Sequence, residues 1–260
     1  MRPVTLITGA SAGIGAELAR VFVEHGHELA LVARREHRLV ELADEIAASG
    51  RSRPHVLRID LEQPGAVTLL AAELIARDLE PANVVNNAGF GLVGQATRLD
   101  RNEQLAMIDL NVRALTELSL AFTDSVARHR GGILNVASLA AFLPGPGMAV
   151  YYASKAYVLS FTEALHHELK GHGVRVTALC PGPVATEFQA RAGLRRDNVR
   201  ILMLPARRVA RIGYRGFMRG DRVVVAGIGN RIVASLLPLI PHALLLSPAD
   251  QRRRSLPRKS

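Results

Sequence analysis

The stretch Thr8-Gly9-Ala10-Ser11-Ala12-Gly13-Ile14-Gly15 decides how this chain of 260 residues is interpreted. It follows the apolar run Val4 to Thr8 and opens a helical pattern that extends from about Gly13 to Glu24. Glycines at such positions permit a tight turn, a close backbone approach to a pyrophosphate, and close packing of the next helix on the sheet. A strand, this turn and a helix in succession indicate a dinucleotide-binding loop, although a purely structural glycine turn is the alternative.

The same alternation of apolar runs and amphipathic stretches continues along the chain. We expect strands at about 4–8, 27–32, 55–59, 83–86, 132–137, 174–179 and 222–225, and helices at about 13–24, 39–48, 66–76, 102–128, 151–170 and 205–219. Apolar strands separated by helices predict an α/β fold, a single Rossmann-type doubly wound parallel sheet with helices on both faces. We expect one domain over residues 1–246, a substrate-specificity segment at about 186–220, and a disordered basic tail at 247–260.

The composition narrows the class of protein. Apolar residues make up 48% and charged residues 22%, which is typical of a globular protein. The single cysteine, Cys180, excludes an internal disulfide and agrees with a cytoplasmic location, as does the strand-like N-terminus without an apolar signal segment. The net charge of +10 comes from scattered arginines, and aromatic residues are only 4%, so a solvated basic surface is favoured over a nucleic-acid partner.

The apolar stretch 232–246 is too short and too interrupted by prolines to span a bilayer comfortably. A helix docked on the domain or on a partner subunit is the favoured interpretation. Contact with a membrane surface is the lesser alternative.

The end of the second expected strand bears on the choice of cofactor. It reads Val32-Ala33-Arg34-Arg35, with no acidic residue where an NAD-preferring protein would bind the ribose hydroxyls. The planar guanidinium of arginine binds phosphate oxygens in pairs, which suits the 2′-phosphate of NADP(H). The alternative is that Arg34 and Arg35 simply begin a solvent-facing helix.

The segment Tyr151-Tyr152-Ala153-Ser154-Lys155 places a tyrosine and a lysine four residues apart at the start of an expected helix. Residues at this spacing share a helix face, so Tyr151 and Lys155 can act together. A nearby ammonium stabilises a phenolate, and we therefore expect it to lower the pKa of Tyr151. Such a pair also occurs often by chance.

Several motifs appear in one order along the chain: the glycine loop, Asn86-Asn87-Ala88-Gly89, Ser138, and the Tyr151/Lys155 pair. Each falls at the carboxyl end of an expected strand or on the adjoining helix, where sheets of this kind bind ligands. In these motifs the chain resembles short-chain dehydrogenases/reductases over about residues 3–190. The resemblance implies hydride transfer between NADP(H) and a carbonyl or secondary alcohol, in a homodimer or homotetramer.

The resemblance also implies residue roles. Tyr151 would exchange a proton with the substrate oxygen, Lys155 would depress its pKa and bind the nicotinamide ribose, and Ser138 would position the carbonyl. Asn111 would hold a water in a proton relay. The cofactor-binding set would be Gly9, Ser11, Ala12, Gly13, Ile14, Gly15, Arg34, Arg35, Asp60, Leu61, Asn86, Ala88, Gly89, Tyr151, Lys155, Pro181, Gly182, Val184 and Thr186. Ala12 departs from the basic residue often found there in NADP-preferring members.

The substrate is less constrained by the sequence. Segments 90–93, 139–148 and 188–204 are expected to line the pocket with Phe90, Leu92, Phe142, Met148 and Phe188. An apolar lining favours a hydrophobic ketone or aldehyde. No metal is expected, because the histidines at 166 and 167 lack matching carboxylates nearby in sequence. The rivals are a non-catalytic NADP(H)-sensing or partner-binding protein on the same fold, and a basic protein that binds nucleic acid or anionic membranes.

Overall fold

The computed structural model describes residues 1–184 and 203–237. Within these ranges seven strands form one parallel sheet in the order β3-β2-β1-β4-β5-β6-β7. The strands are β1 (Arg2–Thr8), β2 (Leu29–Ala33), β3 (His55–Arg58), β4 (Leu79–Asn86), β5 (Gly132–Val136), β6 (Arg175–Pro181) and β7 (Val223–Ala226). The strand order reverses between β1 and β4, which is where a doubly wound sheet opens a crevice for a ligand. The predicted fold class is confirmed.

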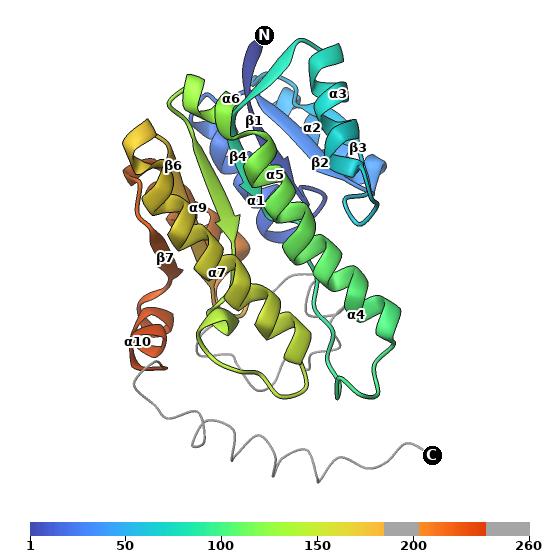
Figure 1. The fold of residues 1–260 in the computed structure, drawn as a ribbon. Coiled ribbons are helices and arrows are strands. Elements are labelled where there is room, and N and C mark those ends of the chain that lie inside the picture. The colour runs from blue at the N-terminus through green and yellow to red at the C-terminus, as the bar shows by residue number, and fades with distance from the viewer. Residues whose placement is uncertain (185–202, 238–260) are drawn as a thin grey trace.

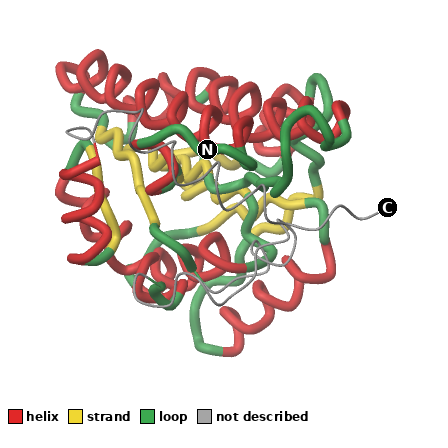
Figure 2. The backbone as a smooth tube through the Cα atoms, turned by 90° about the horizontal axis from the view of Figure 1, so that it is seen from below, coloured by secondary structure: helices red, strands yellow, loops and turns green. Residues whose placement is uncertain are grey.

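Helices cover both faces of this sheet (Figures 1 and 2). They are α1 (Gly13–Glu24), α2 (Glu36–Ala48), α3 (Ala66–Ala76), α4 (Arg101–Ile108), the π-helical turn η1 (Asp109–Ala114), α5 (Leu115–Ala121), α6 (Thr123–Arg128), the 3₁₀ turn η2 (Leu139–Phe142), α7 (Ala149–Leu169), the 3₁₀ turn η3 (Lys170–His172), α9 (Ala206–Arg219) and α10 (Ile228–Leu236). Buried side chains of α1, α2 and α9 share one core cluster, and those of α3 to α7 share another.

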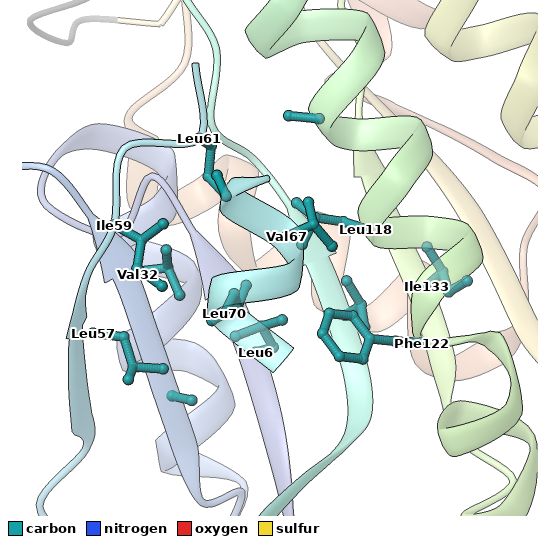
Figure 3. Close-up of a cluster of buried hydrophobic side chains, with 14 of the residues drawn as sticks. Leu6, Val32, Leu57, Ile59, Leu61, Val67, Leu70, Leu118, Phe122 and Ile133 are labelled. Carbon is teal, nitrogen blue, oxygen red and sulfur yellow. The ribbon is translucent and has the colours of Figure 1, made fainter. Parts of the chain in front are cut away.

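The central strand β1 explains why the sheet needs both layers. Leu6 and Ile7 are fully buried, yet consecutive residues of a strand point to opposite faces. Leu6 joins the cluster with Val32, Leu70 and Phe122 drawn in Figure 3, whereas Ile7 joins the cluster beneath α1 and α9. A strand that is apolar on both sides therefore requires helices on both sides.

Two boundaries differ from the sequence-based expectation for physical reasons. The strand β4 begins at Leu79 rather than at 83, because the pairing of β1 with β4 shifts register between Val4 and Thr5 and thereby accommodates Pro81. The helix expected at 102–128 is divided into α4 and α5 by the π-helical turn, and into α5 and α6 by a break at Phe122.

Some expectations concern other parts of the chain. Thr186, Phe188, residues 186–202 of the segment expected to set substrate choice, and the tail at 247–260 lie outside the described residues. Among the described helices, none has the length and apolar character needed to cross a membrane.

Candidate active site

The glycine loop joins β1 to α1 in a geometry that excludes larger side chains. Gly9 has φ +65°, and a Cβ on it would lie 2.8 Å from the Cα of Ala88. A Cβ on Gly15 would overlap the backbone oxygen of Gly9 and Nδ2 of Asn87. The helix begins after Ala12, which offers no side-chain cap, so its first N–H groups are available to an anion. The loop therefore has the geometry of a phosphate-binding loop.

Two polar side chains hold this loop against the end of β4. The hydroxyl of Thr8 accepts hydrogen bonds from the backbone N–H groups of Asn87 (3.0 Å) and Ala88 (3.1 Å). The Asn87 amide donates to the carbonyls of Thr8 (2.9 Å) and Gly9 (3.2 Å). These four hydrogen bonds therefore fix the loop against the turn after β4.

Basic and acidic side chains meet where β2 and β3 end. Nη1 of Arg34 lies 2.9 Å from Oε1 of Glu62 and 4.0 Å from Oδ1 of Asp60. Nη2 of Arg35 donates to the hydroxyl of Ser11 (3.2 Å), which brings its guanidinium beside the phosphate loop. Two guanidinium groups thus lie on the rim of the pocket where β2 and β3 end.

The proton-transfer residues lie at the other end of the same pocket. Ser138 follows β5, and its side chain forms a hydrogen bond with the Tyr151 side chain. Lys155 lies one turn further along α7 and donates from Nζ to the carbonyl of Val136 (2.8 Å). Tyr151 and Lys155 are 9% and 6% exposed, so both polar ends operate in a medium that screens charge weakly.

Burial controls the ionisation of this pair. It raises the pKa of Tyr151 to about 12, against the opposing effect of the hydrogen bond with Ser138. It lowers the pKa of Lys155 to about 8. The expected lowering of the tyrosine pKa by the ammonium was therefore wrong for this structure, because loss of solvent raises this pKa and Lys155 is not among the groups that shift it. Near neutral pH the tyrosine is protonated and the lysine is mostly charged.

Asn111 lies on the π-helical turn and is fully buried. Its amide Nδ2 donates to the carbonyl of Phe90 (3.0 Å) and to Oγ of Ser154 (3.1 Å), while Oδ1 accepts from the N–H of Phe90 (3.1 Å). The side chain of Asn111 is thus committed to positioning the turn after β4 against α7.

A cavity of about 670 Å³ connects the two ends, a size suited to a dinucleotide and part of a substrate. Its lining includes most of the residues expected from the sequence: Gly9, Ser11, Ala12, Gly13, Ile14, Arg34, Arg35, Asp60, Leu61, Ala88, Gly89, Ser138, Tyr151, Lys155, Pro181, Gly182 and Val184. Phe90 and Met148 also line it, as expected for the substrate end, whereas Leu92 and Phe142 pack into the core instead.

Other expected residues occupy supporting positions. Gly15 and Asn111 are not part of the cavity wall, and neither is Asn86, whose amide donates to Ser119 and Asn135 beneath the site. The sequence analysis missed Asn87, which does line the cavity. The second asparagine of the Asn86–Gly89 motif was the available signal. It also missed Glu62, which could be placed only through its contact with Arg34.

Comparison with known proteins places this geometry in a family. A family model described as short chain dehydrogenase matches residues 3–197. Sulfoacetaldehyde reductase 2 of Chromohalobacter salexigens is 40% identical over 191 residues, which cover 72% of this chain and 75% of that protein. The NADP-dependent 3-hydroxy acid dehydrogenase of Escherichia coli is 35% identical over 188 residues, with 71% and 74% covered.

Solved structures agree with this assignment. A short-chain dehydrogenase from Sphingobium yanoikuyae in complex with NADPH superposes with a TM-score of 0.79 at 29% identity, covering 100% of this chain and 98% of that one. The bulky-bulky ketone specific alcohol dehydrogenase from Comamonas testosteroni superposes with a TM-score of 0.75 at 27% identity, covering 100% and 96%. The chain belongs to the short-chain dehydrogenase/reductase family, as its ordered motifs predicted, and the prediction of an oxidoreductase is confirmed.

Proposed function

We propose that this enzyme reduces the carbonyl group of neutral, hydrophobic ketones or aldehydes, and oxidises the corresponding alcohols in the reverse direction. The observation that carries the proposal is the wall beside Ser138 and Tyr151. In the described chain it is formed by the side chains of Phe90, Leu139, Ala140, Leu143, Met148, Tyr152 and Met203. An apolar wall with a few convergent polar groups binds an uncharged substrate and orients its oxygen.

The cofactor is NADP(H). The sequence relative from Escherichia coli is named as NADP-dependent, and the Sphingobium yanoikuyae structure holds NADPH. This chain fits the same group, because Gly9 and Gly15 allow the loop to pack closely against the turn after β4, and Arg35 lies beside Ser11, where it could bind the 2′-phosphate. Arg34, Asp60 and Leu61 would enclose the adenosine.

The residues of this chain would then transfer the proton to the substrate oxygen and stabilise the charges that form. Bound NADPH supplies the hydride to the substrate carbon. Tyr151 carries its proton at neutral pH and would donate it to the substrate oxygen. The O–H bond of Tyr151 breaks in this step and a new O–H bond forms on the substrate. Ser138, already hydrogen-bonded to Tyr151, would donate a second hydrogen bond to that oxygen. The ammonium of Lys155, held by the carbonyl of Val136, would stabilise the phenolate left behind.

The charge of the substrate is the point at which this chain and its sequence relatives can differ. The two relatives act, by their names, on sulfoacetaldehyde and on 3-hydroxy acids, which are anions. Among the described residues lining the cavity, the only cation near the catalytic end is Lys155, since Arg34 and Arg35 line the adenosine end. Among these described residues, a buried sulfonate or carboxylate would therefore have no cationic partner at this wall other than Lys155, which favours a neutral substrate.

The test compares NADPH-dependent reduction of an aryl ketone, a keto acid of similar size, and sulfoacetaldehyde. We expect kcat/KM to favour the aryl ketone over both anions by on the order of 100-fold, the size of an uncompensated polar burial. A preference for either anion would overturn the proposed substrate class. No turnover of any carbonyl by the wild type would overturn the reaction itself.

We also propose that the enzyme forms a homodimer or homotetramer through α4, α5 and α7. These helices expose Leu105, Ile108, Leu120 and Tyr157, which are 51%, 41%, 56% and 40% accessible. Apolar side chains of this kind on neighbouring helices are typical of subunit interfaces. Light scattering should give a mass of two or four chains, and a monomer across the working concentration range would contradict the proposal.

A further inference from the structure

The last described helix, α10, carries an exposed apolar stripe. Ile228, Ile232 and Leu236 are 77%, 56% and 52% exposed, and their spacing of four residues keeps them on one side of the helix. The opposite side is anchored, since Asn230, Ala234 and Leu237 are buried and the Asn230 amide donates to the carbonyl of Ala226 (2.7 Å). The stripe is therefore a fixed feature of the surface.

The helix α10 itself carries charge of one sign. The only charged side chain of α10 is Arg231, which is exposed and makes no ion pair with a described residue. By contrast, Arg222, just before β7, is paired with Glu163. An exposed helix face with aliphatic side chains, an unpaired arginine and no acid matches the interfacial type of amphipathic helix.

The sequence that follows α10 extends the same character. Residues 239–246 read Leu-Ile-Pro-His-Ala-Leu-Leu-Leu, without a formally charged side chain at neutral pH. Residues 250–260 then contain five cations, Arg252, Arg253, Arg254, Arg258 and Lys259, against the single acid Asp250. An apolar element next to a basic cluster is the combination of two signals that holds peripheral proteins on anionic bilayers.

We propose that α10 binds the surface of a membrane rich in anionic phospholipids. The apolar stripe, defined as Ile228, Ile232 and Leu236, would insert at the level of the lipid headgroups, and Arg231 would meet their phosphates, with the positive charge of the following sequence adding to the attraction. This proposal does not depend on the substrate class proposed above.

Two other binding partners of the apolar stripe fit the positive charge beside it less well. A second copy of the chain would place the same patch against itself, which brings Arg231 and the basic cluster toward their own copies. A nucleic acid would require aromatic side chains on which bases stack, or arginines without an apolar stripe between them. Among described residues from 203 onward the aromatic side chains are Tyr214 and Phe217, which are only 7% and 0% exposed.

The position of α10 relates this surface to the active-site cavity. The helix lies just beyond the carboxyl end of β7, at the same end of the sheet as the start of α7 (Figure 1). The first turn of α7 contains Tyr151. A Cβ on Gly182, which lines the cavity, would overlap the side chain of Asn230 on α10. Attachment through the stripe would therefore hold the cavity close to the bilayer.

The test is co-sedimentation of the full chain with phosphatidylcholine vesicles, with and without about a third phosphatidylglycerol, at low and high salt. The test variant is Ile228→Asn/Ile232→Asn. The matched control is Leu69→Asn/Ile75→Asn on α3, where the two side chains are 54% and 66% exposed. Circular dichroism and NADPH-dependent turnover establish that each variant is folded, since none of these residues belongs to the catalytic machinery.

We expect the wild type to bind the anionic vesicles and not the neutral ones, with binding lost at high salt. The α10 variant should bind about tenfold more weakly or worse, whereas the α3 control should match the wild type. Absence of binding by the wild type, or equal binding by the α10 variant, would overturn the proposal. A lower molecular mass of the α10 variant in light scattering would overturn the proposal too. The same holds if the wild type and the α10 variant bind duplex DNA equally well and the DNA displaces the vesicles.

Discussion

The amide Nδ2 of Asn111 lies 3.1 Å from Oγ of Ser154, and the Ser154 hydroxyl donates to the backbone carbonyl of Tyr151 at 2.7 Å. These two hydrogen bonds connect the π-helical turn to the first turns of α7. Both side chains are almost fully buried, at 0% and 3% exposure, so water cannot replace either partner without rearrangement. Ser154 is therefore a positioning residue for the tyrosine.

Ser154→Ala should disturb this connection without removing a reacting group. We expect the free energy of unfolding to fall by about 1 kcal/mol and kcat to fall several-fold, with KM for NADPH little changed. The matched control is Ser160→Ala, on the exposed side of the same helix. Denaturant unfolding and steady-state kinetics measure the two effects. A loss of stability with unchanged kcat would limit Ser154 to a structural role.

Tyr151→Phe removes the proton donor and keeps the ring. The variant should lose at least about 100-fold in kcat, because general acid catalysis contributes factors of that size, while its affinity for NADPH should remain close to that of the wild type. Tyr152→Phe is the control, since its ring contacts that of Tyr151 with centroids 6.0 Å apart. Turnover of Tyr151→Phe near the wild-type rate would remove the tyrosine from its assigned role.

Much of the fold could be predicted from the sequence because its signals are local. Strand periodicity and the glycine loop predict the sheet, and Gly9 and Gly15 have the tight surroundings that their positions imply. The predicted limits were less accurate for elements whose ends depend on pairing with another strand. The strand β4 passes through Pro81 only because β1 shifts register beside it, and nothing in the local sequence reports that shift.

The candidate site shows the same division. Ser138, Tyr151 and Lys155 could be named from spacing, and the structure brings them together around one cavity. The direction of the tyrosine pKa could not be predicted, because it depends on how completely the folded chain excludes water from Tyr151. The link between Arg34 and Glu62 joins residues 28 positions apart and likewise needs the fold.

The buried ammonium of Lys155 makes stability depend on pH. Burial lowers its pKa from 10.5 to about 8, so between these values the unfolded chain binds more protons than the folded one. This group therefore adds to the free energy of unfolding as pH rises from about 8 to 10.5 and withdraws that contribution as pH falls. At about 1.4 kcal/mol per unit of pKa, the whole effect is at most about 3 kcal/mol.

Lys155→Met removes this cost of burying a charge. Its melting temperature should exceed that of the wild type near pH 7, and the difference should shrink toward pH 10, even though the variant is inactive. Thermal unfolding followed by circular dichroism across this range measures the difference. The control is Lys170→Met, at an exposed position after α7. A difference that stays constant with pH would exclude the titration of Lys155 as its cause.

Gly15→Ala should distort the glycine loop between β1 and α1. The added methyl group would overlap the carbonyl oxygen of Gly9 and the amide of Asn87, so the loop must open or α1 must shift. We expect a loss of about 1–3 kcal/mol in stability and a weaker affinity for NADPH. Gly171→Ala is the control, because a Cβ there meets no atom within 4 Å. Unchanged NADPH affinity in a folded Gly15→Ala variant would contradict a role of this closely packed loop in binding the pyrophosphate.

The two arginines after β2 should contribute unequally to cofactor choice. The guanidinium of Arg35 lies 3.2 Å from the Ser11 hydroxyl in the phosphate loop, whereas that of Arg34 is held at 2.9 Å by Glu62. Arg35→Leu should therefore raise the Kd for NADPH by about 10- to 100-fold and leave that for NADH nearly unchanged, since only the 2′-phosphate distinguishes the two. Arg34→Leu should have a smaller and less selective effect, because its charge is already compensated. Arg38→Leu, whose guanidinium is paired with Glu41 on α2, provides the control for removing a positive charge nearby. Fluorescence titrations of the wild type and each variant with both cofactors measure the Kd values. A selective loss of NADPH affinity in Arg34→Leu alone would reverse the assignment.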